Sequence, residues 1–181
     1  VSRASIREAF SAMEIIGLIE VRPGEGSFVT DLNIGPFIST ISPLLVSSES
    51  MDADLLDFRK LIEMEAVRLA AMKSDEAGQA LLMRPIEKME KALKENDSVM
   101  GAEADIEFHK VLFNLTGNYI LIKAAECTAY LLESSVRFNR AKILTDERNA
   151  KILLDQHKEI FSAVSRRNAQ EAAEIMDRHL N

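Results

Sequence analysis

Apolar residues near the start of the chain recur every three or four positions, which is the period of an amphipathic helix. Ser2 stands just before this pattern and is a favourable residue for capping the first turn of a helix. Gly17 follows the last apolar position, where helices commonly end in a left-handed residue. The pattern therefore predicts a helix between Ser2 and Gly17, with its apolar face formed by Ile6, Ala9, Phe10, Met13 and Ile16.

Residues 18–29 change from this helical period to alternation. Residues 18–21 alternate like a strand, residues 23–26 have the Pro and Gly content of a turn, and residues 27–29 read as a returning strand. A two-stranded hairpin is only marginally stable by itself, so we expect it to pack on the preceding helix.

Beyond residue 30 we expect a linker and then a long helical segment. Residues 31–50 are rich in Ser, Pro and Gly, which is typical of a linker. Residues 51–181 return to the helical period, with short breaks between the apolar stretches. The expected helices run from Asp52 or Asp54 to about 72, from 74 to 95, 97 to 115, 118 to 143, 145 or 146 to 166, and from a capping box at 168–171 onward.

These elements define a mostly α-helical chain of three parts. Residues 1–30 form a helix and a β-hairpin, residues 31–50 a linker, and residues 51–181 an antiparallel six-helix bundle. Pro85 falls inside the second helix of the bundle, where it removes a backbone donor, and predicts a kink or a division into two pieces.

Composition narrows the class of protein further. The chain of 181 residues is 47% hydrophobic and carries a net charge of −7. No apolar run approaches the roughly 18 to 20 residues that a membrane helix needs. Cys127 is the single cysteine, so an intramolecular disulfide and a multi-cysteine zinc site are excluded, and a reducing cytoplasm is the expected compartment.

The three histidines, His109, His157 and His179, are the strongest candidates for chemistry. Asp105 precedes His109 by four positions, so both side chains lie on one face of a helix. His157 lies ten residues before the expected break at Arg167, and His179 lies twelve residues after it, so a helical hairpin puts them at similar heights. The four groups can then converge on one divalent cation, and Zn²⁺, Ni²⁺, Mn²⁺ and Fe²⁺ all suit this ligand set. The alternatives are core or surface histidines and a simple helical Asp–His pair.

Arg3 and Arg7 project from one side of the first helix, where arginines can contact guanine or phosphate. The alternative is a solvated surface, and residues 1–30 are not basic overall, since three arginines are set against four glutamates. The phosphate affinity of this segment must therefore depend on local placement, on helices upstream of Val1, or on dimerisation.

The front of the chain resembles the winged helix-turn-helix domain of GntR-type bacterial transcription regulators. The resemblance rests on VSRASIREA at residues 1–9, EIIGLI at 14–19 and GEGSFV at 24–29. It implies that Ser2, Arg3, Ser5 and Arg7 approach DNA, and that the tip at Gly24 and Gly26 enters the minor groove. Because the pattern opens in its middle, at a residue other than Met, we expect the front of the winged domain to lie upstream of Val1, and the chain alone to bind operator DNA poorly.

Most of residues 51–181 are similar to the FCD effector domain of the FadR-like branch of these regulators. The matching pieces include LLDFRKLIEME at 55–65, DIEFH at 105–109, QHKEI at 156–160 and MDRHL at 176–180. In that family an Asp and three His bind a divalent metal inside a six-helix bundle, and a carboxylate metabolite docks on or near it. The resemblance implies this role for Asp105, His109, His157 and His179. The chain departs from the pattern around residues 77–85, where the second helix reads as interrupted.

Arg59 is a further candidate. It stands four positions before Glu63, so one interpretation is a helical surface pair. The other is a guanidinium that holds the carboxylate of an effector with two hydrogen bonds. The sequence does not decide whether Asn114, Arg137 and Asn139 also line a cavity.

Three functions fit these observations. The favoured one is a homodimeric, ligand-responsive regulator that binds operator DNA and is not an enzyme. The second is a metalloenzyme built on a helical bundle, which would need a positioned general base. The third is a regulator whose metal only stabilises the fold.

Overall fold

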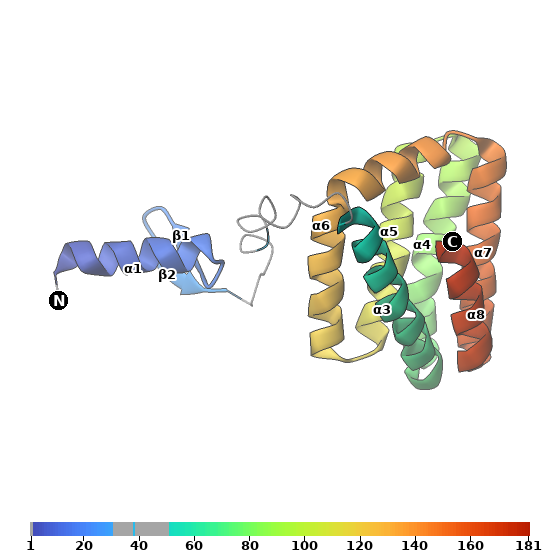
Figure 1. Ribbon diagram of the computed structural model, residues 1–181, viewed down its shortest axis with the longest axis horizontal. Helices are drawn as coiled ribbons and strands as arrows, with labels where there is room; N and C mark the ends of the chain where they lie inside the picture. Colours follow the sequence, from blue (N-terminus) through green and yellow to red (C-terminus); the bar gives the residue numbers. More distant parts are fainter. Residues whose placement is uncertain (1, 31–37, 39–50) are drawn as a thin grey trace.

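The computed structural model describes residues 2–30, 38 and 51–181, with the backbone alone at 51–52 and 132–143. The expected linker over residues 31–50 therefore lies outside the described residues, apart from Ile38. Within the described ranges the chain forms a helix with a hairpin and a bundle of six helices (Figure 1). The predicted fold class is confirmed.

The N-terminal unit is one helix and two antiparallel strands. Helix α1 spans Arg3–Ile15, strand β1 spans Ile19–Arg22, and strand β2 spans Gly26–Val29. Ile19 lies opposite Val29 in the ladder. Between helix and hairpin, Gly17 adopts a φ of 76°, and its carbonyl accepts a hydrogen bond of 2.6 Å from the hydroxyl of Thr30.

The C-terminal unit is a helical bundle. Its helices are α3 (Met51–Lys73), α4 (Glu76–Glu95), α5 (Ser98–Leu115), α6 (Tyr119–Ile143), α7 (Glu147–Ser165) and α8 (Ala169–Leu180). Helix α5 packs against α3, α4 and α6, and helix α8 packs against α3 and α7. None of the helices in the described ranges is long and apolar enough to cross a membrane.

The ends of the bundle helices follow from local chemistry. The carboxylates of Asp75, Asp97 and Asp146 accept hydrogen bonds from the first turns of α4, α5 and α7. The side-chain oxygen of Asn168 accepts from Glu171 in the same way at the start of α8. The predicted capping box is only half formed, because the Glu171 carboxylate returns to the side-chain amide of Asn168 rather than to its backbone.

Of the two outcomes that the sequence predicts for Pro85, a kink or a division of the helix into two pieces, the division is wrong. Helix α4 is continuous from Glu76 to Glu95, with Pro85 inside it. Pro85 is buried together with Leu82, Ile86 and Met89, on the face that packs against α5 and α7. Burial of this face outweighs the backbone hydrogen bond that the proline removes.

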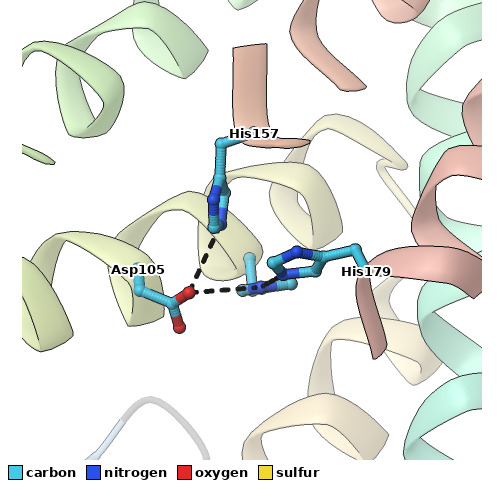
Figure 2. Close-up of side chains that lie close together, drawn as sticks. Asp105, His157 and His179 are labelled. Atoms are coloured by element: carbon cyan, nitrogen blue, oxygen red, sulfur yellow. Dashed lines mark hydrogen bonds and ion pairs between the residues drawn. The ribbon is translucent and has the colours of Figure 1, made fainter. Parts of the chain in front are cut away.

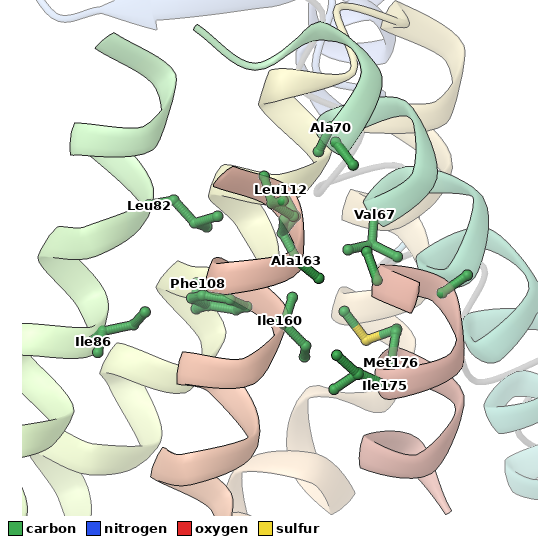
Figure 3. Packing of buried hydrophobic residues seen from close by; sticks show 14 of the residues in the cluster. Val67, Ala70, Leu82, Ile86, Phe108, Leu112, Ile160, Ala163, Ile175 and Met176 are labelled. Atoms are coloured by element: carbon green, nitrogen blue, oxygen red, sulfur yellow. The ribbon is translucent and has the colours of Figure 1, made fainter. Parts of the chain in front are cut away.

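The core of the bundle is formed by α3, α4, α5, α7 and α8, and α3 contributes the fully buried Val67 and Ala70 (Figure 3). Phe108 of α5 is fully buried and is the largest side chain in this cluster. Leu82 and Ile86 of α4 and Ile160 of α7 belong to the same cluster. This packing fixes the mutual heights of α5, α7 and α8, the three helices that carry the histidines.

Candidate metal centre

The structure brings Asp105, His109, His157 and His179 together in the interior of the bundle. Asp105 and His109 come from α5, His157 from α7 and His179 from α8. All four residues are buried, and one ligand atom from each lies within 4.8 Å of the others. Figure 2 shows Asp105, His157 and His179 converging from three helices.

The short distances join the Nε2 side of the rings and the Asp105 carboxylate. His157 Nε2 is 3.3 Å from Asp105 Oδ1, and His109 Nε2 is 4.0 Å from the same oxygen. His179 Nε2 lies 3.3 Å from His109 Nε2. The centre of the cluster is therefore surrounded by one carboxylate and three imidazole nitrogens.

Each imidazole is oriented by an acceptor at its other nitrogen. His157 Nδ1 donates to the backbone oxygen of Leu153 at 2.7 Å, and His179 Nδ1 donates to Gln156 Oε1 at 2.9 Å. His109 Nδ1 donates to Glu63 Oε2. With the proton held at Nδ1, the lone pair of a neutral ring is at Nε2 and faces the centre, as in histidines that bind metals.

These residues fit a divalent cation. His157 Nε2 is fully buried and makes no hydrogen bond to any described residue, although Asp105 is near. Three lone pairs and a carboxylate that face one another repel unless a proton or a cation lies between them. One oxygen and three imidazole nitrogens are ligands of Zn²⁺, Ni²⁺, Mn²⁺ and Fe²⁺, and the geometry does not choose among them.

Glu63 is a residue of this site that the sequence analysis considered only as a partner of Arg59. Its Oε1 accepts from Arg59 Nε at 2.6 Å, and its Oε2 accepts from His109. Burial raises the pKa of Glu63, but the pairing with His109 and with the Arg59 guanidinium outweighs burial and holds this pKa well below its usual range. Burial lowers the pKa of His109, although Glu63 and Asp105 act to raise it, and the Arg59 guanidinium helps to keep the Glu63 carboxylate ionised.

A cavity of about 320 Å³ lies beside the cluster, between α3, α5 and α6. Its lining includes Arg59, Glu63 and His109, together with Lys110 and Asn114. Of the four clustered residues, His109 borders this cavity. The side chains of Arg137 and Asn139 lie outside the described residues.

The candidate DNA-binding residues lie at one end of α1 and at the tip of the hairpin. All six are exposed. The Ser2 hydroxyl accepts from the Ser5 backbone at 3.1 Å and lies 2.9 Å from the Ser5 hydroxyl, so it caps α1. Gly24 lies in the turn between β1 and β2, and Gly26 is the first residue of β2. Their φ values of 80° and 118° favour glycine.

Comparison with known proteins agrees with the resemblance to transcription regulators over most of the chain. Residues 54–181 match the FCD domain family. The chain is 31% identical over 186 residues to the HTH-type transcriptional regulator LutR of Bacillus subtilis, covering 99% of this chain and 82% of that protein. It is 29% identical over 169 residues to the Glc operon transcriptional activator of Escherichia coli, covering 92% of this chain and 66% of that protein.

A solved structure supports the fold. Streptococcus agalactiae GntR matches with a TM-score of 0.73 at 23% identity, covering 99% of this chain and 80% of that one. Both relatives above are named as regulators of transcription, not as enzymes.

Proposed function

The chain belongs to the GntR-type transcription regulators that carry an FCD domain, and from this membership we propose that a metal-dependent carboxylate sensor controls its binding to DNA. It is a regulator and not an enzyme. One observation carries the proposal: the cluster of Asp105, His109, His157 and His179 lies beside a cavity that Arg59 and His109 line together.

Asp105, His109, His157 and His179 would hold the cation through one oxygen and three nitrogens. The bound ion would supply a Lewis-acid position for an oxygen of the effector. The chain's own contribution is orientation, because Leu153, Gln156 and Glu63 each fix one imidazole.

Arg59 is the proposed partner of the effector carboxylate. Its Nε donates to Glu63, and the terminal N–H groups of its guanidinium remain for a ligand in the cavity that it lines. Lys110 and Asn114 add a positive charge and an amide to the same wall. Such a lining suits a small carboxylate metabolite.

The DNA side of the proposal rests on Arg3 and Arg7 of α1, with Ser2 and Ser5 beside them and the hairpin tip at Gly24 and Gly26. A homodimer would present two such units to two half-sites of an operator, and an effector would alter their spacing. The cytoplasm, where bacterial DNA lies, is the proposed compartment.

We expect small carboxylates to stabilise the metal-loaded chain and to have little effect on the metal-free chain. The test is a thermal-unfolding screen of the chain with Zn²⁺, Ni²⁺, Mn²⁺ and Fe²⁺, each with and without a set of small carboxylates. A carboxylate at about 100 times its Kd adds about 2.7 kcal/mol of stability. In Arg59→Gln we expect at least a tenfold loss of carboxylate affinity, about 1.4 kcal/mol.

Arg68→Gln is the matched control, since Arg68 lies on the same helix and pairs with Gln170 instead of lining the cavity. Stabilisation by metal with no response to any carboxylate would favour the alternative in which the metal only supports the fold.

Arg3→Ala and Arg7→Ala should each weaken DNA binding by about 5- to 150-fold, the cost of one lost arginine contact to a base. The duplex is selected from a random pool, and binding is measured at low ionic strength, where phosphate contacts are strongest. Arg148→Ala is the control, because that side chain is 90% exposed at the start of α7. Equal affinity of the Arg3, Arg7 and Arg148 variants would contradict the assignment.

A further inference from the structure

We propose that Glu63 is a positioning residue that couples the acid-binding cavity to the metal centre. This inference rests on the proposed function. The Glu63 carboxylate holds Arg59 with one oxygen and His109 with the other, so a ligand seated on Arg59 and a cation held by His109 share one buried anion.

The contacts of Glu63 span two helices and two sites. Arg59 and Glu63 belong to α3, and Arg59 lines the cavity. His109 belongs to α5 and is one of the four clustered residues. The side chain of Glu63 is only 3% exposed, so water cannot replace either partner without a change in the packing.

The buried charges determine whether the metal and the acid strengthen or weaken each other's binding. With Asp105 and Glu63 ionised, Arg59 protonated and the three histidines neutral, these buried groups carry one net negative charge in the absence of a metal. A bound dication changes this to one net positive charge, and a monocarboxylate bound to Arg59 then brings the net charge to zero. Because buried charges are costly unless they are compensated, each ligand should favour the other.

Glu63 also competes directly with the acid. As long as Arg59 donates to Glu63, an incoming carboxylate must share the Arg59 guanidinium with the Glu63 carboxylate. A cation at His109 Nε2 draws the Nδ1 proton of His109 more strongly toward Glu63. The hold of Glu63 on Arg59 then weakens, and the guanidinium is freer to bind the acid.

Glu63→Gln should therefore change the two affinities in opposite directions. We expect Co²⁺ affinity to fall about 10- to 100-fold, because His109 loses its anionic acceptor. We expect acetate to bind the metal-free variant at least about fivefold more tightly than it binds the metal-free wild type, because Arg59 has lost its internal competitor. A merely structural role for Glu63 would weaken both.

The experiment uses the full chain, with Co²⁺ as the metal probe, acetate as the acid probe and acetamide as its uncharged counterpart. Co²⁺ binding is followed by its visible absorption spectrum, and acetate binding by calorimetry with and without Co²⁺. Glu65→Gln makes the same change of charge at an exposed position of α3 and should leave both affinities as in the wild type. Circular dichroism of each metal-free variant verifies that the bundle is folded.

Opposite changes in Glu63→Gln, together with a Co²⁺ spectrum that differs from that of the wild type, support the coupling. Weakening of both affinities, or acetate binding equal to that of the wild type, overturns it while leaving the proposed function intact. Failure of the wild type to bind Co²⁺ overturns the proposed function as well.

Discussion

Asp105→Asn should abolish the stabilisation that a divalent metal gives to the bundle. Asp105 supplies the one oxygen among the four converging groups, and Asn keeps its shape but loses its charge. At about 1,000 times the Kd, metal binding adds about 4 kcal/mol to the free energy of unfolding. For a chain of this size that corresponds to a rise of roughly 8 to 16 °C in the unfolding temperature, which the variant should lack.

The measurement is thermal unfolding with and without metal, after treatment with a chelator. Without metal we expect Asp105→Asn to be at least as stable as the wild type, because it removes a buried charge. Asp155→Asn, an exposed substitution on α7, should respond to metal as the wild type does. A full metal response in Asp105→Asn would remove Asp105 from the ligand set.

Phe108→Ala should lower the free energy of unfolding by about 3 to 5 kcal/mol, the usual cost of deleting a buried aromatic ring. Phe108 has no exposed surface. Its ring stands edge-on to His157, with centroids 4.6 Å apart and an interplanar angle of 88°. The cavity left by the ring would also loosen His157, so metal affinity should fall along with stability.

Chemical unfolding of the metal-free chain measures the first effect separately from the second. Phe58→Ala is the matched control, because Phe58 is 44% exposed and should cost much less. A loss below about 1 kcal/mol in Phe108→Ala would show that the core collapses to fill the space.

The boundaries of the helices could be predicted because local residues set them. Asp97 caps α5 through hydrogen bonds within its own first turn, and Asn168 does the same for α8. Gly117 takes the left-handed conformation just after α5, as its position after the apolar pattern suggests. Such signals act over three or four residues and can be recognised in the sequence alone.

At Pro85 and Glu63, local sequence signals do not determine the structure, because contacts with other helices decide it. The local rule for Pro85 allows a kink or a break, but the packing of α4 against α5 and α7 keeps the helix continuous. The local rule for Glu63 finds Arg59 four residues away, and that pair is present. His109 lies 46 residues further along the chain, so no pattern within one helix could reveal it as the second partner.

The positions of His157 and His179 could be estimated by counting residues across the turn between α7 and α8. Arg167 provides the reversal with a φ of 57°. The two rings lie with their centroids 4.5 Å apart, at similar heights in the helical hairpin. The orientation of each ring could not be estimated in this way, because it depends on the acceptor at Nδ1.

The three groups that accept from the histidine Nδ1 atoms differ in how much sequence change they tolerate. His157 is held by the main-chain oxygen of Leu153, which every amino acid carries, so position 153 can drift without disturbing that ring. His179 and His109 depend on the side chains of Gln156 and Glu63, which only a few residue types could replace. Among related sequences that keep the same four converging groups, positions 63 and 156 should therefore vary far less than position 153.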